Sequence, residues 1–563
     1  MKPFIFELSS FEKLFQDRKM VIPYYQRDYI WNEENWEKWL NDIRELLKCE
    51  DAEEFHFIGS IICQKRPKTD SLFPEYLIID GQQRITTFFC FCLSILEILE
   101  KNTSKPSLLT EKIYQLLFVS DKNEPRLFMR GEDEKSLEAV IYHKNSETNE
   151  QRISKTHEYF KKKLGTNVVE KHLKDYFEKL KSKFKFISID LKEEDDALEI
   201  FKSINTSGIM LTSVDLIKAE FFITYERKGL SSDCKKLSEE WEDIKIRVGK
   251  ENMDHFFYIF LLSKHRQQGE YSREEFYTFF RDKLIRVGKD IQQLWNEIVQ
   301  KSKIYSQIIN PQLDYWGKDF YLPVLEAKVL NLDRIYPLVI VLKEKGLQGK
   351  KEASILKRLI TYAFRIKTKR ITFQQSEVFR WIRLVQNDQL DSILNDLNIL
   401  KEIERSDDFW VELEQKFLKE SEIKWLLTRF YLTILPEGFF ISSLQLEHMF
   451  PKKPDKEQWR IPEWKELEED KKKVKEKLNS LGNATLLNSN QNISASNKVW
   501  KLKREEFKKK TCLQHEKNEL DLLNKLVFLP EDIDKRKKWL IQQFKESGIL
   551  FIDERKERSQ LTS

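Results

Sequence analysis

Several features that define secreted, zinc-finger and membrane proteins are missing from this sequence. Its six cysteines include no Cys-x-x-Cys pair and no zinc-finger spacing. The N-terminus, Met1-Lys2-Pro3-Phe4, lacks the apolar core of a secretion signal. The longest apolar run, Phe88 to Leu99, is too short to cross a bilayer and predicts a buried helix instead. The cysteine pattern fits a reducing cytosol, so we expect a cytoplasmic protein that binds no membrane. Internal repeats and low-complexity linkers are also missing.

The length and the charge distribution indicate several domains and a basic C-terminal region. A chain of 563 residues is too long for one ordinary core, so two or three domains are expected. Residues 441–563 carry 27 Lys+Arg against 21 Asp+Glu, whereas the first 440 residues carry 71 against 72. This excess would suit contacts with phosphate, although lysine-rich runs are also ordinary solvated surfaces.

The C-terminal segment Leu446 to Lys503 contains the residues with the clearest chemistry. Glu447 and His448 are adjacent at what reads as the end of a strand, and Asn483 precedes a second short strand. Hydrolysis of a phosphodiester needs a base to activate water and a cation to stabilise negative charge. Glu447 and Asn492 offer the oxygen ligands that Mg²⁺ accepts. A lone Glu-His pair would more often be a chance strand cap, but spaced elements in this order favour a nuclease site.

This pattern resembles the HNH, or ββα-metal, nuclease domain, in the variant found at the C-terminus of GmrSD-type restriction enzymes. The family pattern is an acidic-His-x-x-Pro motif, then Gly-Asn-x-Thr-Leu, then two spaced asparagines and a lysine. The resemblance covers about the last quarter of the chain. It implies these roles: His448 as general base, Glu447 and Asn492 as metal ligands, Asn483 as the group that orients the histidine or its strand, and Asn497 and Lys503 as the tail of the motif.

Three unusual segments lie in the first 227 residues: 22–31, 76–87 and 201–218. In the second, an apolar strand ends at Asp80-Gly81 and turns into a helix, which leaves free backbone N–H groups that suit an anion. Arg84 adds a fork of donors for phosphate, and Asp80 offers a carboxylate to a metal or a ribose hydroxyl. Taken alone, Asp-Gly-Gln-Gln-Arg is a weak signal, and residues that cap the helix and tie down a loop explain it better than a ligand site does.

Together the three segments resemble the N-terminal domain of the same GmrSD family. The family pattern is Ile-Pro-x-Tyr-Gln-Arg-x-Tyr-x-Trp, then Asp-Gly-Gln-Gln-Arg-x-Thr, then Phe-x-x-Ile-Asn-x-x-Gly, and all three are present. The family fold is related to ParB and sulfiredoxin, and it implies binding and hydrolysis of a nucleoside triphosphate. The implied pocket residues are Tyr25, Gln26, Arg27, Asp80, Gln83, Arg84 and Asn205. Arg27 and Arg84 would meet phosphates. Tyr25, Tyr29 and Trp31 are explained equally well as a small aromatic core.

The remaining sequence predicts helices. Residues 229–437 carry apolar residues at helical spacing without a metal or nucleotide motif, which indicates a helical connector. Residues 464–478 read as one charged helix that is solvated or touches DNA through its lysines. In residues 498–510, Trp500 and Phe507 are predicted to anchor a helix. The DNA-contacting residues predicted on this helix are Lys501, Lys503, Arg504 and Lys508.

The sequence therefore predicts a mostly helical α+β protein with a ParB/sulfiredoxin-like domain (1–227), a helical connector (228–437) and an HNH nuclease domain (438–563). The favoured function is a modification-dependent DNA restriction endonuclease in antiviral defence, with Mg²⁺ and GTP or ATP as cofactors. Its expected partner is double-stranded, modified phage DNA, and a homo-oligomer is left open. The alternatives are a nucleotide-switched DNA-binding protein that does not cut, and a nuclease that attacks unmodified DNA or RNA.

Overall fold

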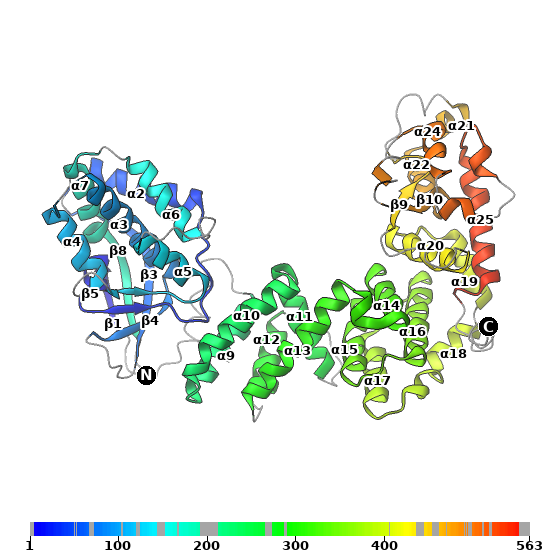
Figure 1. Ribbon diagram of the computed structural model, residues 1–563, viewed down its shortest axis with the longest axis horizontal. Coiled ribbons are helices and arrows are strands. Elements are labelled where there is room, and N and C mark those ends of the chain that lie inside the picture. Colours follow the sequence, from blue (N-terminus) through cyan, green and yellow to red (C-terminus); the bar gives the residue numbers. More distant parts are fainter. Residues whose placement is uncertain are drawn as a thin grey trace. The chain divides into compact units, whose positions relative to one another are not determined.

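The computed structural model contains two compact units, residues 1–254 with 271–297, and residues 255–270 with 298–563. Figure 1 labels their helices and strands. The residues that it describes are 5–49, 51, 53–66, 73–102, 105–119, 124–142, 152–165, 168–191, 212–264, 273–286, 290–404, 406–434, 444–452, 461–468, 470–488, 490, 492–493, 498–508, 512–516 and 521–550. The predicted boundary at residue 227 falls inside the first unit, and the boundary at 437 lies outside the described residues. The three-domain division therefore stays a prediction.

The first unit is built on a six-stranded mixed sheet. Its strand order is β1-β8-β3-β4-β2-β7, with β3 parallel to β8, β2 parallel to β4 and β7, and the other neighbours antiparallel. The strand bounds are β1 Ile5–Ser10, β2 Lys19–Val21, β3 His56–Lys65, β4 Glu75–Asp80, β7 Leu127–Phe128 and β8 Phe184–Leu191. A separate pair joins β5 (Phe118–Val119) to β6 (Glu124–Pro125). A mixed sheet in a mostly helical chain agrees with the predicted α+β class.

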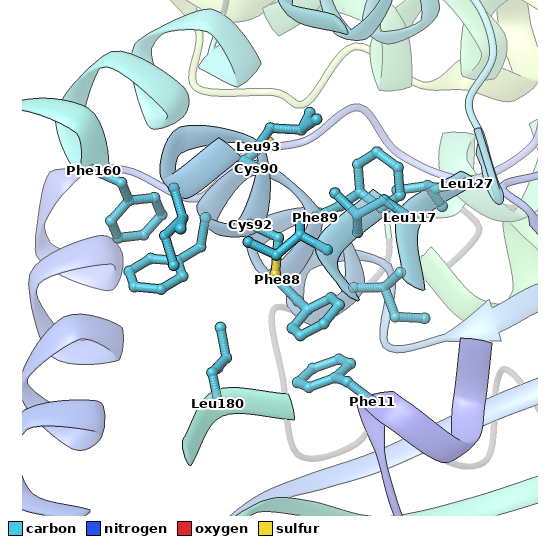
Figure 2. Packing of buried hydrophobic residues seen from close by; sticks show 14 of the residues in the cluster. Phe11, Phe88, Phe89, Cys90, Cys92, Leu93, Leu117, Leu127, Phe160 and Leu180 are labelled. Carbon is cyan, nitrogen blue, oxygen red and sulfur yellow. The ribbon is translucent and has the colours of Figure 1, made fainter. Parts of the chain in front are cut away.

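Helix α3 (Gln82–Asn102) forms the centre of the core beside this sheet. Its residues from Ile85 to Leu99 are all buried, and Figure 2 shows Phe88 and Phe89 among side chains from other helices and strands. The Phe88 ring stacks on Phe11 with 4.1 Å between ring centroids. The predicted buried helix is confirmed. The other helices around the sheet are α1 Phe11–Phe15, α2 Glu33–Lys48, α4 Leu108–Leu117, α5 Glu132–Ile141, α6 Arg152–Leu164 and α7 Glu170–Lys183.

Residue Gly81 makes the sharp turn from β4 into α3. Its φ of +98° is a backbone conformation that residues with a side chain rarely adopt. A Cβ at this position would also lie 2.8 Å from Ile61 Cγ1. Glycine is therefore required here on two independent grounds, and the predicted strand-turn-helix arrangement is confirmed.

Helices make up most of the described part of residues 212–434, as predicted. They are α9 Ser213–Arg227, α10 Cys234–Val248, α11 Met253–Lys264, α12 Arg273–Phe280, α13 Ile291–Ile309, α14 Leu313–Val329, α15 Tyr336–Glu344, α16 Lys350–Thr368, α17 Gln375–Gln386, α18 Leu397–Glu404, α19 Ser406–Gln415 and α20 Glu420–Ile434. Helix α14 is interrupted at Gly317, whose φ of +74° is not helical, so two helical segments meet there at a kink.

After α20, the residues that the structure describes form a small two-stranded sheet and four α-helices, which belong to the second unit. Strand β9 (Gln445–His448) pairs antiparallel with β10 (Ala484–Leu487). The helices are α21 Pro462–Glu468, α22 Lys471–Leu478, α24 Trp500–Phe507 and α25 Pro530–Ser547. Their core includes Trp464, stacked 3.6 Å from Phe450, and Trp500, stacked 4.8 Å from Phe528.

The prediction of a single helix over 464–478 is wrong. Two helices occupy this stretch, and Asp470 caps the second by accepting hydrogen bonds from Lys472 N and Lys473 N. The carboxylate of an aspartate accepts hydrogen bonds from the unpaired backbone N–H groups at a helix N-terminus, so aspartate favours the start of a helix over its interior. Among the helices that the structure describes, none is long and apolar enough to span a bilayer.

Candidate functional site

The strand pair β9–β10 carries the first group of predicted site residues. In its register Ala484 lies opposite His448, and Thr485 lies opposite Glu447. The pairing ends with a hydrogen bond from Met449 N to the Asn483 carbonyl, at 2.8 Å. The sequence therefore brings the Glu-His motif and the Gly-Asn motif together at one end of this small sheet.

The side chain of Asn483 fixes the backbone that follows His448. It is completely buried. Its Oδ1 accepts from Phe450 N at 2.8 Å, and its Nδ2 donates to the carbonyls of Phe450 (3.0 Å) and Leu478 (2.9 Å). The turn that carries Asn483 is itself held from α25, because Arg536 donates to the carbonyls of Gly482 and Ala484 at 3.0 and 2.7 Å.

Lys503 of α24 lies under the Glu-His pair. Its side chain is 0% exposed, and that of Glu447 is 12% exposed. The Lys503 ammonium donates to Glu447 Oε1 and, at 2.6 Å, to the His448 carbonyl. The prediction that Lys503 contacts DNA is wrong, because a completely buried ammonium that is paired with a carboxylate cannot meet a phosphate.

The other predicted DNA contacts on α24 divide into exposed and covered residues. Lys501 and Lys508 are exposed, and Lys508 pairs with Glu505 at 3.1 Å. The Arg504 side chain is only 12% exposed and donates to the Lys525 carbonyl at 2.9 Å. Arg504 therefore does not face outward as predicted, because it serves to attach α24 to the following loop. Trp500 and Phe507 are buried, so their predicted role as anchors is confirmed.

Burial dominates the electrostatics of this site. It raises the pKa of Glu447, against the opposing effect of Lys503. It also lowers the pKa of His448 to about 4, and the charge of Lys503 contributes to the same shift. The imidazole is therefore neutral at pH 7. Burial lowers the pKa of Lys503 as well, although its contact with Glu447 partly compensates.

Two buried polar atoms beside this pair have no hydrogen-bond partner within the described part of the chain. They are His448 Nε2 and Asn492 Oδ1. Asn492 belongs to this site because its Nδ2 donates to Gln445 Oε1 of β9 at 2.8 Å. Buried polar atoms are nearly always paired, so these two call for an explanation. Amide and carboxylate oxygens are suitable ligands for a hard divalent cation, so Asn492 and Glu447 fit the metal that was predicted. Asn497 lies outside the described residues.

The predicted nucleotide pocket of the first unit is only partly brought together. A cavity of about 320 Å³ is lined by three of the predicted residues, Tyr25, Gln26 and Arg27. Its other wall comes from helices α9 and α10, through Lys218, Trp241, Glu242 and Lys245 among others. A smaller adjoining cavity shares part of this wall and reaches Arg130 and Asp133.

Asp80, Gln83 and Arg84 are not among the residues that line these cavities. Gln83 Oε1 accepts from Ile30 N (2.9 Å) and Trp31 N (3.3 Å), which ties down the loop before α2. Arg84 donates to the carbonyl of Ser60 at 2.8 Å and lies 3.7 Å from Asp80. These contacts agree with the alternative interpretation, in which Gln83 and Arg84 tie down a loop. Asn205 lies outside the described residues.

The aromatic residues of the first motif have two different roles. Tyr29 is buried, shares a 2.7 Å hydrogen bond with Thr87 and accepts from Trp36 Nε1 at 3.0 Å. Trp31 packs edge-on against Trp39, with 5.8 Å between ring centroids. These two residues form the small aromatic core that was considered, whereas Tyr25 lines the cavity.

Both cavities contain charges of opposite sign at close range. Asp28 pairs with Lys245 at 3.0 Å. Burial lowers the pKa of Lys218, whose ammonium lies 5.8 Å from the centroid of the Trp241 ring. Burial and the charge of Asp28 raise the pKa of Asp133 to about 7, although a hydrogen bond from Tyr29 N opposes the shift.

Sequence reasoning missed the part of the cavity wall that α9 and α10 supply. Lys218 could have been predicted from the sequence, because it is the last residue of the third unusual segment. Trp241 and Lys245 belong to an ordinary amphipathic helix pattern, in which nothing separates a lining residue from any other. His255, which was interpreted as structural, bonds to the Tyr305 hydroxyl at 2.7 Å, and His265 lies outside the described residues.

Comparisons with known proteins find a matching family for an N-terminal and a C-terminal part of the chain. Residues 11–222 match the N-terminal domain of the GmrSD restriction endonuclease, and residues 386–543 match the C-terminal domain of GmrSD restriction endonucleases. An uncharacterized protein of Methanocaldococcus jannaschii is 23% identical over an alignment of 338 residues, and the match covers 52% of this chain and 53% of that protein. The chain thus spans about half the length of this relative. The predicted resemblance is confirmed by the two domain matches, and the chain belongs to the GmrSD restriction endonuclease family.

Proposed function

We propose that this protein is a metal-dependent endonuclease that cuts modified double-stranded DNA in defence against phages, under the control of a nucleoside triphosphate bound in the first unit. The observation that carries the proposal is the strand end at His448. There a half-buried glutamate, a neutral imidazole and an asparagine lie beside one small sheet, and His448 Nε2 and Asn492 Oδ1 have no hydrogen-bond partner among the described residues. Membership in a restriction endonuclease family supports the same reading.

The residues of this site divide the work of hydrolysis. His448 accepts a proton from the attacking water, for which its neutral state at pH 7 is required. Glu447 and Asn492 would hold the metal ion. When bound, that ion stabilises negative charge on the phosphate and the departing 3′ oxygen. Asn483 keeps the backbone beyond His448 in place through three hydrogen bonds.

A nicking assay on supercoiled plasmid, with Mg²⁺ or with EDTA, tests the nuclease assignment. His448→Ala should reduce the rate by about 10²–10⁴-fold, the usual contribution of a general base. Asn492→Ala should raise the Mg²⁺ concentration needed for half-maximal cutting. His172→Ala is the matched control, because His172 is exposed on α7 in the other unit. Full activity of His448→Ala would contradict the assignment.

The cavity in the first unit supports nucleotide binding. Arg27, Lys218 and Lys245 offer cations to phosphate oxygens, while Asp28 and Glu242 offer carboxylates to an accompanying Mg²⁺. A volume of about 320 Å³ lies within the usual range for small-molecule sites. Titration with fluorescent GTP and ATP analogues tests this part. Arg27→Ala should weaken binding about tenfold, the usual effect of losing one charge-assisted hydrogen bond. Equal binding by native protein and variant would exclude Arg27 from the site.

A further inference from the structure

Lys503 carries a charged ammonium in a completely buried position, and the roles proposed for the nuclease site do not account for it. Three lysines are buried in the described part of the chain, and Lys503 is the one at 0% exposure. Its ammonium donates to two acceptors of the motif strand, Glu447 Oε1 and the His448 carbonyl. A buried ammonium is costly unless it is paired and hydrogen-bonded. A residue that served only to fill the core would be apolar, so the charge itself has a function.

Helix α24 delivers this ammonium from a fixed position. Trp500 and Phe507 lie three residues before and four residues after Lys503, on the same face of the helix. Both are buried, and Trp500 Nε1 donates to the Lys525 carbonyl at 3.0 Å. Arg504 binds the same carbonyl at 2.9 Å. The helix is therefore attached on both sides of Lys503, and its ammonium has little freedom to move.

We propose that Lys503 is a positioning residue of the nuclease site, which fixes the Glu447 carboxylate and the end of strand β9 so that Glu447 and His448 point in their working directions. The inference rests on the proposed function and deepens it. One ammonium suits this task because it carries three donors on a compact centre and can serve a side-chain oxygen and a main-chain oxygen together. Lys503 acts through Glu447 and His448, and it contacts neither DNA nor the reacting phosphate.

The competing role is the phosphate contact that the basic run of α24 suggests, and the two roles predict different kinetics. Losing a positioning residue lowers kcat, because small errors in geometry are expensive in rate. Losing a phosphate contact weakens DNA binding and reduces its salt dependence. Lys503→Met keeps the length and apolar character of the side chain but removes the charge. Lys535→Met on α25 is the matched control, since Lys535 is exposed and pairs only with Glu531 among the described residues.

Nicking kinetics and metal-free DNA binding separate these outcomes. Lys503→Met should lower kcat by about 100-fold, the scale of a 1 Å misplacement. Its KM and its DNA affinity in EDTA should stay within about threefold, with an unchanged salt slope. An unchanged kcat, or a large loss of DNA affinity with a smaller salt slope, would overturn the proposal. If Lys503→Met fails to fold, Lys503→Arg decides. It keeps the charge but moves the donors, so a folded variant with native kcat would also overturn it.

Mn²⁺ binding gives a readout that does not depend on cutting. We would measure the Mn²⁺ affinity of the native protein, Lys503→Met, Glu447→Gln and the double variant. If Lys503 acts through Glu447, the two changes are coupled, and the double variant should depart from the product of the single effects by about fivefold or more. Independent effects would overturn the positioning role. A native protein that neither binds Mn²⁺ nor cuts DNA would instead refute the proposed function itself.

Discussion

At the scale of single residues, the site depends on buried side chains that hold the main chain in place through hydrogen bonds. Asn483 and Lys503 were both noticed in the sequence, because each belongs to a motif. Their contacts could not be predicted, since Asn483 bonds to Leu478 and Phe450, and Lys503 is turned inward by aromatic residues on its own helix. Lysines 501 and 503 look alike in the sequence, and only the packing of α24 distinguishes the exposed one from the buried one.

Asn483→Ala should destabilise the second unit. The change leaves Phe450 N and two carbonyls buried without their partners, at a cost of about 2–4 kcal/mol. Urea unfolding monitored by tryptophan fluorescence measures this loss. The control is Asn479→Ala, whose side chain makes one exposed hydrogen bond to Lys475 O at 2.8 Å and should cost less than about 1 kcal/mol. Equal stability of the two variants would contradict the structural role of Asn483.

Asp133 should make the first unit less stable as the pH rises. Its pKa is raised to about 7 from an ordinary value of 3.8, so between these values the folded state holds a proton that the unfolded state has lost. Stability therefore falls between about pH 4 and pH 7 and is constant above. Asp133→Asn keeps an acceptor for Tyr29 N and removes the ionisation. Its stability relative to native protein should rise by about 1–3 kcal/mol over this range, allowing for solvent screening. A difference that does not change with pH would exclude this account.

At the scale of helices and strands, local sequence signals predicted most of what the structure contains. Strand β4 ends at Asp80 as expected, β10 begins directly after Asn483 as expected, and Asn32 caps α2. These elements follow from capping, from glycine at a positive φ and from a short apolar run, which are all local properties. The strand order of the sheet and the wall that α9 and α10 add to the cavity arise from contacts far apart in sequence, and no local pattern encodes them.

The contact between α25 and the turn before β10 provides a prediction about elements. A Cβ on Gly482 would penetrate the carbonyl group of Ile533 on α25. Gly482→Ala must push the helix away from the turn that carries Asn483, at a cost of about 3 kcal/mol. A fall in the melting temperature, together with a loss of nicking, is the expected result. Lys535→Ala on the exposed side of α25 is the control and should melt like native protein. A Gly482→Ala variant that is as stable as this control would show that the close approach is not needed.

At the scale of the whole molecule, the two candidate sites lie in different compact units. The cavity with Arg27 and Lys218 belongs to the first unit, and the Glu447–His448 strand belongs to the second. The order of the two domains could be predicted from the motifs, because one set of motifs matches the N-terminal domain of the family and the other matches its C-terminal domain. The division into compact units could not, since the helices between the motifs carry only ordinary amphipathic patterns.

Separate sites predict separable activities. His448→Ala should abolish cutting and leave nucleotide binding and turnover at native levels, because the contacts described for His448 are with residues of the second unit. Arg27→Ala should impair nucleotide turnover at least tenfold and disturb the control of cutting, while the metal affinity of the second unit is kept. Both activities would be measured on the same preparations, by phosphate release and by plasmid nicking. Loss of turnover in His448→Ala would contradict the separation.

The most direct test of the central claim is cleavage of phage DNA that carries glucosylated hydroxymethylcytosine, compared with matched unmodified DNA. The assay contains Mg²⁺, is run with and without GTP or ATP, and uses native protein and His448→Ala. We predict that native protein cuts the modified DNA selectively and in a nucleotide-dependent manner, and that His448→Ala does not cut. Equal cutting of both DNAs, or cutting that survives the loss of His448, would contradict this account.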